Sequence, residues 1–206
     1  MTFGRVLVDV GAGDGGYVLH RARTEPTTFA IAIDASPDAL ANGAWRAKRA
    51  CLANVAFLVE GVERLPRELT YIADEVTVHF PWGSLLRGLV DGSSAIVGPI
   101  AGLMKEGAQL RVLLSAGERD GFAEVTPSVI ASRSEDFAEH GLRLVDARWA
   151  SSANVAETRS AWAKRLGPSR PVVFARYSRR SSRRGLISAG TSPGVQGIHS
   201  TRNLPS

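Results

Sequence analysis

The feature that most constrains this chain is a glycine-rich turn between an apolar segment and a helical one. Residues 5–10 (RVLVDV) are mostly apolar and are followed by GAGDGG. A short apolar run that ends in glycines is typical of a buried parallel strand entering a helix, which we expect over residues 16–24. Gly11 and Gly13 can adopt positive φ and let a ligand approach the backbone closely. The turn therefore predicts a nucleotide-type ligand at the start of the domain.

The rest of the chain repeats this alternation of strand and helix. We expect further strands at residues 29–33, 55–59, 75–80, 110–115, 143–149 and 172–177. We expect helices at residues 37–51, with Ser36 as N-cap and Pro37 in the first position, and at 96–104, closed by Lys105 and Gly107. Alternation of this kind predicts an α/β fold with a seven-stranded, mostly parallel, doubly wound sheet and helices on both faces.

The composition fits one globular domain in 206 residues, with 44% hydrophobic and 22% charged side chains. We place the domain in residues 1–177 and interpret residues 178–206, rich in Ser, Gly and Arg, as a disordered basic tail. The single cysteine, Cys51, excludes an intrachain disulfide. We find neither a signal peptide nor an apolar run of the roughly 18 residues that span a bilayer, and therefore expect a cytoplasmic protein, by default monomeric.

The charge is uneven along the chain. The formal net charge is +5, yet no Asp or Glu follows Glu157, and ten of the 25 basic residues lie from Arg159 onward. The first 158 residues therefore carry fifteen basic against twenty acidic side chains. A basic C-terminal part favours a polyanionic partner such as RNA, because each phosphate contact releases counterions. A merely solvated basic tail is the alternative for the Arg179 to Arg184 cluster.

Acidic residues around the glycine turn indicate which ligand it binds. Asp9 precedes the glycines, where a carboxylate accepts from an amino group and would repel a pyrophosphate. Asp34 ends the second expected strand, the usual place for a carboxylate that binds ribose hydroxyls. Val62 and Glu63 follow the third strand, where side chains can contact an adenine ring. The pattern favours S-adenosylmethionine over a nicotinamide dinucleotide or a glycine turn with only a packing role.

A second motif, FPWGSLLRG at residues 80–88, follows the fourth expected strand, whose carboxyl end faces the reacting methyl group in this fold. Phe80 stands where amino-methylating enzymes usually carry Asn or Asp, which suits a substrate that already offers a ring-nitrogen lone pair. Trp82 and a second tryptophan, Trp162, could sandwich a flipped base. Taken singly, each tryptophan could equally be a core or loop anchor. We assign Trp45 and Trp149 no site role.

Taken with DVGAGDG, the segment at residues 63–66 and SAWAKRL at 160–166, the FPWGSLLRG motif resembles the aminoglycoside-resistance 16S rRNA methyltransferases of the Kam/Npm type. The resemblance covers about residues 5–177. It implies a class I Rossmann-like fold and methyl transfer from S-adenosylmethionine to N1 of adenine 1408 in the 30S decoding site. It also implies resistance to kanamycin- and apramycin-like drugs, with 16S rRNA as the partner and no metal.

The resemblance also implies roles for individual residues. The cofactor site would be lined by Asp9, Gly11, Gly13, Asp34, Val62, Glu63, Phe80 and Ser160. Trp82 and Trp162 would hold the flipped adenine, with no general base. RNA phosphates would be contacted by Arg46, Lys48, Arg49, Arg165 and Arg170, although a solvated helix face is an equal alternative for the first three.

Family members carry a hairpin before the first strand, which here begins close to Met1. We therefore expect either that the chain is truncated or that its docking relies on the basic helix and loops alone. Three other functions stay open. One is methylation of a different RNA, such as guanine N7 of tRNA. The others are a non-catalytic RNA-binding module with this fold and a small-molecule methyltransferase, against which the basic C-terminal part counts.

Overall fold

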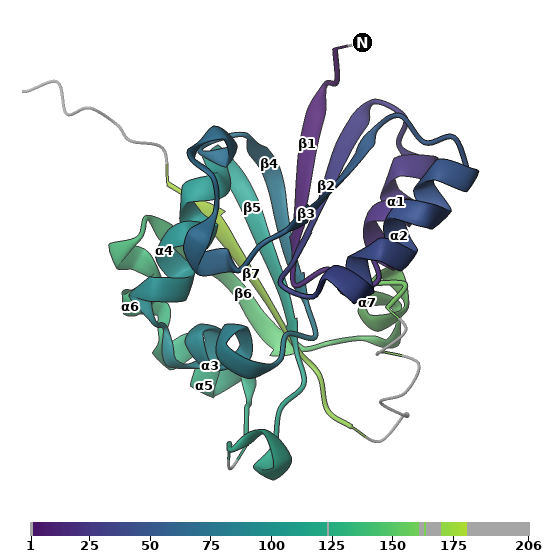
Figure 1. Cartoon of the computed structure of the whole chain (residues 1–206). Helices are drawn as coiled ribbons and strands as arrows, with labels where there is room; N and C mark the ends of the chain where they lie inside the picture. Colours follow the sequence, from purple (N-terminus) through teal and green to yellow (C-terminus); the bar gives the residue numbers. More distant parts are fainter. Residues whose placement is uncertain (1, 123, 161–162, 164–169, 181–206) are drawn as a thin grey trace, which may run out of the picture.

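The computed structural model describes residues 2–122, 124–160, 163 and 170–180, which form one α/β domain around a seven-stranded sheet (Figure 1). The strand order is β3-β2-β1-β4-β5-β7-β6. Strands β1 to β5 pair in parallel, whereas β7 runs antiparallel to both of its neighbours. The strands are β1 (Arg5–Val10), β2 (Thr28–Asp34), β3 (Val55–Val59), β4 (Ala73–His79), β5 (Met104–Leu114), β6 (Leu142–Trp149) and β7 (Val173–Arg179).

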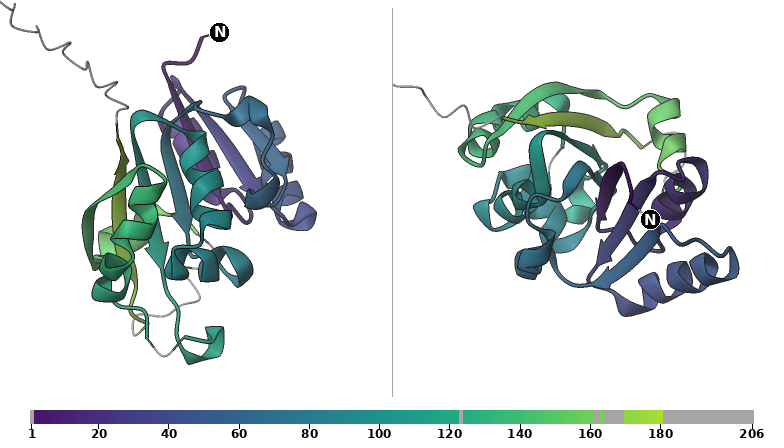
Figure 2. Two further views of the ribbon diagram at one scale, coloured as in Figure 1. Left: turned by 90° about the vertical axis from the view of Figure 1, so that its left-hand side faces the viewer. Right: turned by 90° about the horizontal axis from the view of Figure 1, so that it is seen from above.

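Helices cover both faces of the sheet (Figures 1 and 2). One face carries α1 (Gly16–Thr24), α2 (Pro37–Arg49) and α7 (Ser152–Glu157). The other carries α3 (Gly83–Asp91), α4 (Ser94–Leu103), α5 (Pro127–Ser132) and α6 (Ser134–Glu139). Central strands read as continuous apolar runs because both of their faces are buried, as Val8, Val76 and Val78 are.

The expected alternation of strands and helices is confirmed, and all seven expected strands are present. The α2 helix begins as expected, with Pro37 in its first turn and the Ser36 side chain accepting a hydrogen bond from the Ala39 amide. The expected domain ends at residue 177, but β7 continues to Arg179. Residues 181–206, and with them most of the expected tail, lie outside the described residues.

One expectation about an individual element was wrong, and one helix was missed. The helix expected to close at Lys105 and Gly107 ends at Leu103, and β5 begins at once with Met104, because this segment pairs with Ala73 of β4. Segment 83–91 forms α3, for which we had no expectation, although Leu85, Leu86, Leu89 and Val90 recur at helical spacing.

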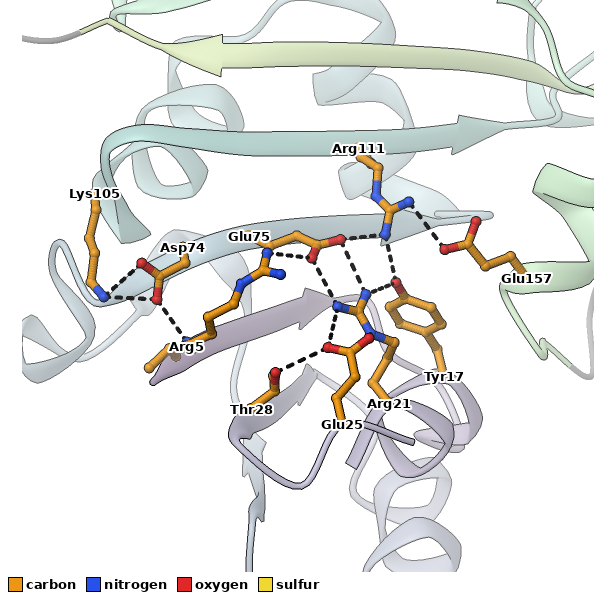
Figure 3. Close-up of polar contacts among 11 residues, drawn as sticks. Arg5, Tyr17, Arg21, Glu25, Thr28, Asp74, Glu75, Lys105, Arg111 and Glu157 are labelled. Carbon is orange, nitrogen blue, oxygen red and sulfur yellow. Dashed lines mark hydrogen bonds and ion pairs between the residues drawn. The ribbon is translucent and has the colours of Figure 1, made fainter. Parts of the chain in front are cut away.

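A buried ionic network joins α1 to the two central strands (Figure 3). Glu75 of β4 is 7% exposed and accepts hydrogen bonds from Arg21 of α1 at 3.1 and 3.3 Å and from Arg111 of β5. Arg111 also reaches Glu157 at the end of α7, with Nη1 3.2 Å from the carboxylate. The network therefore ties α1 and α7 to the same part of the sheet.

Candidate active site

The glycine turn lies at the carboxyl end of β1, where two of its glycines have the left-handed backbone conformation. Gly11 has φ of 71° and Gly13 has φ of 56°. A Cβ atom on Gly11 would lie 2.8 Å from Leu85 Cδ2, the end of a side chain that can move, so it is the positive φ that requires glycine there. In this turn the Gly13 amide donates to the side chain of Asp34 and not to a backbone carbonyl.

Asp34 is held firmly at the end of β2. Its Oδ2 accepts a hydrogen bond from the Gly13 amide at 2.7 Å, and its Oδ1 accepts one from the Ser36 amide at 2.8 Å. Each carboxylate oxygen has a second lone pair, so two acceptor positions stay available to a ligand. The carboxylate that was expected to bind ribose hydroxyls is thus preoriented by the backbone on both sides.

Two hollows meet at Gly11, Asp34 and Trp82. The first has a volume of about 360 Å³ and is mostly apolar, with Ile33, Val62, Glu63, Pro81 and Leu85 in its wall. The second has a volume of about 310 Å³ and is more polar, with Asp9, Gly13, Tyr17, His79, Phe80, Thr158 and Ser160 in its wall. This shape fits an elongated ligand with a flat apolar end, a central diol and a charged end, which describes S-adenosylmethionine.

Asp9 lies beneath the polar hollow and is 2% exposed. Its Oδ1 accepts a hydrogen bond from Thr77 Oγ1 at 2.6 Å and lies 3.5 Å from Nδ1 of His79. Burial raises the pKa of the Asp9 carboxyl to about 7, and the nearby negative charges of Asp34 and Glu75 add to this. Burial, together with a smaller effect of the Arg111 guanidinium, lowers the pKa of His79 to about 3.

Phe80 and Trp82 follow β4 as the sequence predicts. Phe80 is buried at a positive φ of 52°, and its amide donates to the Leu113 carbonyl at 2.8 Å. A non-glycine residue in this conformation is strained, and such strain gathers at ligand sites. Trp82 is the N-cap of α3 and is 74% exposed, which is unusual for a large aromatic side chain. It borders both hollows and leaves a broad ring surface to solvent.

The structure brings all eight expected cofactor-site residues and Trp82 to the two hollows. Trp162 and Arg165 lie outside the described residues. Lys48 and Arg49 are exposed on α2, where Arg49 lies over the Trp45 ring at 4.7 Å. Arg46 pairs with Asp14 at 3.0 Å, and Arg170 pairs with Asp120 at 2.6 Å.

Sequence reasoning missed several residues that line the hollows, among them Tyr17, His79, Leu85 and Thr158. His79 and Tyr17 pack edge to face at 4.5 Å, a contact between β4 and α1 that spacing along the chain does not reveal. Leu85 could have been found from the helical spacing of the leucines after Trp82. Within the described residues, no group of three or more His, Cys, Asp or Glu side chains is arranged to hold a metal ion.

A comparison with protein families matches residues 1–180 to the NpmA family, described as 16S rRNA (adenine(1408)-N(1))-methyltransferase. The chain belongs to this family. The matched region, residues 1–180, includes all of β1 to β7 and the residues that line both hollows. The resemblance seen in the glycine turn and the FPWGSLLRG motif is thereby confirmed, as is the class of enzyme: an S-adenosylmethionine-dependent rRNA adenine-N1 methyltransferase.

Individual relatives agree with the family. The chain is 29% identical over 190 residues to a 16S rRNA (adenine(1408)-N(1))-methyltransferase of Escherichia coli, covering 85% of this chain and 87% of the relative. It is 33% identical over 177 residues to the enzyme of the same name from Streptoalloteichus tenebrarius, covering 80% and 81%.

Solved structures of 16S rRNA methyltransferases are also similar to this chain. A mutant of the 16S rRNA (adenine(1408)-N(1))-methyltransferase of Catenulisporales acidiphilia, crystallised with cosubstrate S-adenosylmethionine, superposes with a TM-score of 0.80 at 27% identity over 88% of each chain. The 16S rRNA methyltransferase KamB superposes with a TM-score of 0.76 at 29% identity, over 87% of this chain and 90% of that one. The class I methyltransferase fold and its cofactor are therefore shown.

Proposed function

We propose that this chain transfers a methyl group from S-adenosylmethionine to N1 of adenine 1408 in 16S rRNA of the 30S subunit, which gives aminoglycoside resistance. The observation that carries the proposal is the two-part cleft at the carboxyl ends of β1, β2 and β4, with the exposed Trp82 beside it, in a chain that belongs to the NpmA family. We further propose that the enzyme acts as a monomer in the cytoplasm. Among the described residues, no helix is both long and apolar enough to cross a membrane.

The cofactor would be bound along its whole length. Asp34 would accept from the ribose hydroxyls, because two backbone amides already hold its carboxylate in place. Val62 and Glu63 would contact the adenine end, and Asp9 would accept from the methionine amino group. Gly11 and Gly13 let the ligand approach the backbone, and Phe80 and Ser160 would complete the wall. When bound, S-adenosylmethionine supplies a methyl group that the sulfonium already activates.

The residues around the target would act by orientation rather than by acid–base chemistry. N1 of an unpaired adenine carries an in-plane lone pair, so no proton has to be removed before it attacks. Trp82 and Trp162 would hold the flipped adenine between them, with N1 facing the methyl group. The ring gains positive charge on methylation, which an indole face stabilises through a cation–π contact. Neither Asp9, hydrogen-bonded to Thr77, nor the buried neutral His79 is assigned the role of a base.

Basic side chains outside the cleft would bind the RNA backbone. Lys48 and Arg49 are exposed on α2 and available to phosphates, and Arg165 would act after the second tryptophan. Arg46 and Arg170 already pair with carboxylates, so RNA would have to share or displace Asp14 and Asp120. We therefore expect smaller losses of RNA affinity when either of these two paired arginines is replaced.

The test uses purified protein, tritiated S-adenosylmethionine, and either intact 30S subunits or naked 16S rRNA, followed by primer extension. We expect incorporation into 30S subunits and a stop one nucleotide before adenine 1408, since N1 methylation blocks base pairing. Incorporation elsewhere in the rRNA, or into tRNA in a parallel reaction, would replace the proposed target with another RNA. Tight RNA binding without incorporation would indicate a non-catalytic binding module.

A further inference from the structure

We propose that a groove beside the cofactor cleft binds the RNA strand that flanks the target nucleotide, with Arg23 and Arg159 on its phosphates and Trp149 stacked on one of its bases. This inference rests on the RNA substrate proposed above. The groove has a volume of about 1160 Å³ and lies between α1, α7 and the neighbouring ends of β6 and β7. We call it the α1–α7 groove. Its arginine, histidine and aromatic lining residues are His20, Arg23, Arg46, Trp149, Arg159 and Arg170.

The charged side chains that line the α1–α7 groove are all positive. The described residues that line it include four arginines and one histidine, and no Asp or Glu. Arg46 and Arg170 pair with carboxylates outside this lining, whereas Arg23 and Arg159 are exposed and form no ion pair with any described carboxylate. An unneutralised pair of guanidinium groups in a concave surface is suited to bind phosphate oxygens.

The groove is continuous with the cleft that would hold the target base. Gly16 and Ser160 line both the α1–α7 groove and the polar hollow of the cofactor cleft. The backbone of Arg159 has φ of 51°, and its carbonyl oxygen lies so close to Gly16 that a Cβ atom there would be 3.1 Å away. A nucleotide flipped toward Trp82 stays joined to its neighbours, and the groove gives their backbone a basic path away from the cleft.

Trp149 gives the groove a stacking surface. It is the last residue of β6 and is 47% exposed, although the strand position alone suggests a packing role. Basic grooves with exposed aromatic side chains are typical of single-stranded nucleic acid binding, where stacking contributes about 1–3 kcal/mol per base.

The test measures binding of labelled protein to 30S subunits as a function of KCl concentration, together with methylation rates. The variants are Arg23→Glu, Arg159→Asn and Trp149→Ala. Asparagine is chosen at position 159 because it tolerates a positive φ while removing the charge. The matched control is Arg143→Glu, an exposed arginine near the start of β6, at the other end of that strand from Trp149 and the groove. Calorimetry with S-adenosylmethionine reports whether each variant is folded.

We expect each groove variant to lose about tenfold or more in 30S affinity, equivalent to about 1.4 kcal/mol. The two arginine variants should also lower the slope of log affinity against log salt by about 0.7–0.9 for each lost phosphate contact. Affinity for S-adenosylmethionine should stay nearly unchanged, and Arg143→Glu should bind 30S subunits like the parent.

Groove variants that bind 30S subunits like Arg143→Glu would overturn the inference, and so would a parent protein that does not bind 30S subunits. A parent that binds through the groove but methylates no RNA would overturn the proposed function and leave the groove established. Competition by free ATP as strong as that by an RNA oligonucleotide would make the groove a nucleotide site instead.

Discussion

Nδ1 of His79 lies 3.5 Å from Oδ1 of Asp9, and both side chains are almost entirely buried beneath the polar half of the cofactor cleft. With its pKa lowered to about 3, His79 is neutral across the physiological range, so the contact is not an ion pair there. Asp9, whose pKa is raised to about 7, is the member of this pair that titrates near neutral pH. With the role proposed for Asp9, its protonation state would link cofactor binding to pH.

We predict that the affinity for S-adenosylmethionine weakens as pH falls below about 7, by up to tenfold per pH unit. The ammonium group of the cofactor needs the ionised carboxylate, and the free protein holds a proton on Asp9 below that pH. Calorimetric titrations from about pH 5.5 to about pH 8.5 measure this directly. The Asp9→Asn variant should bind more weakly and without the pH step. A dissociation constant that is flat from about pH 6 to about pH 8 in the parent would contradict the role given to Asp9.

The same carboxyl makes stability depend on pH in the opposite sense. Its pKa in the folded protein lies above its ordinary value of 3.8, so the fold favours the protonated form. The stability this gives is complete below about pH 4 and is lost as pH rises through about 7. We expect Asp9→Asn to unfold at higher urea than the parent at pH 8 when both lack cofactor. Equal urea midpoints at pH 8 would argue against a raised pKa.

Replacing Trp82 by alanine should lower kcat/KM for 30S methylation by about 5- to 150-fold, the equivalent of one lost stacking contact of roughly 1–3 kcal/mol. The cofactor affinity should change little, because most of the ring, 74% exposed, faces solvent rather than the hollows. Trp82→Phe keeps a flat ring and should recover most of the rate. Equal losses of methylation and of cofactor affinity in Trp82→Ala would place the ring against the cofactor instead of the base.

Asp34→Asn should weaken S-adenosylmethionine binding by about 10- to 100-fold, since hydrogen bonds to a charged group contribute about 1.5–3 kcal/mol. An asparagine offers one carbonyl oxygen, whereas the carboxylate accepts from the amides of both Gly13 and Ser36. Its amino group would face one of these donors and disturb the glycine turn. Asp38→Asn, an exposed change in the first turn of α2, is the matched control and should bind like the parent. Similar affinities for the two variants would remove Asp34 from the site.

The sequence predicted the strands well because a sheet buried on both faces leaves continuous apolar runs, as at Arg5–Val10 and Thr28–Asp34. From positions at strand ends it predicted that Asp9, Asp34 and Val62 lie near one another, and the parallel order brings them to the two hollows, whereas Ser160 came only from the family resemblance. It did not predict α7, a helix of six residues whose capping by Ser151 and Asn154 is a weak signal. Nor could it reveal that Trp149 and Arg159 line one groove, because this depends on tertiary packing between β6 and α1.

The ionic network around Glu75 gives the last prediction (Figure 3). Glu75→Ala should destabilise the protein by about 3–5 kcal/mol, because it removes a buried carboxylate that Arg21 and Arg111 share and leaves them only the more exposed Glu25 and Glu157 as carboxylate partners. Lys105→Ala removes the more exposed pair with Asp74, where Nζ lies 2.8 Å from the carboxylate, and should cost only about 0–1 kcal/mol. Urea unfolding followed by circular dichroism measures both. A loss below about 1 kcal/mol in Glu75→Ala would mean that water replaces the carboxylate, and that the network does not hold α1 against β4 and β5.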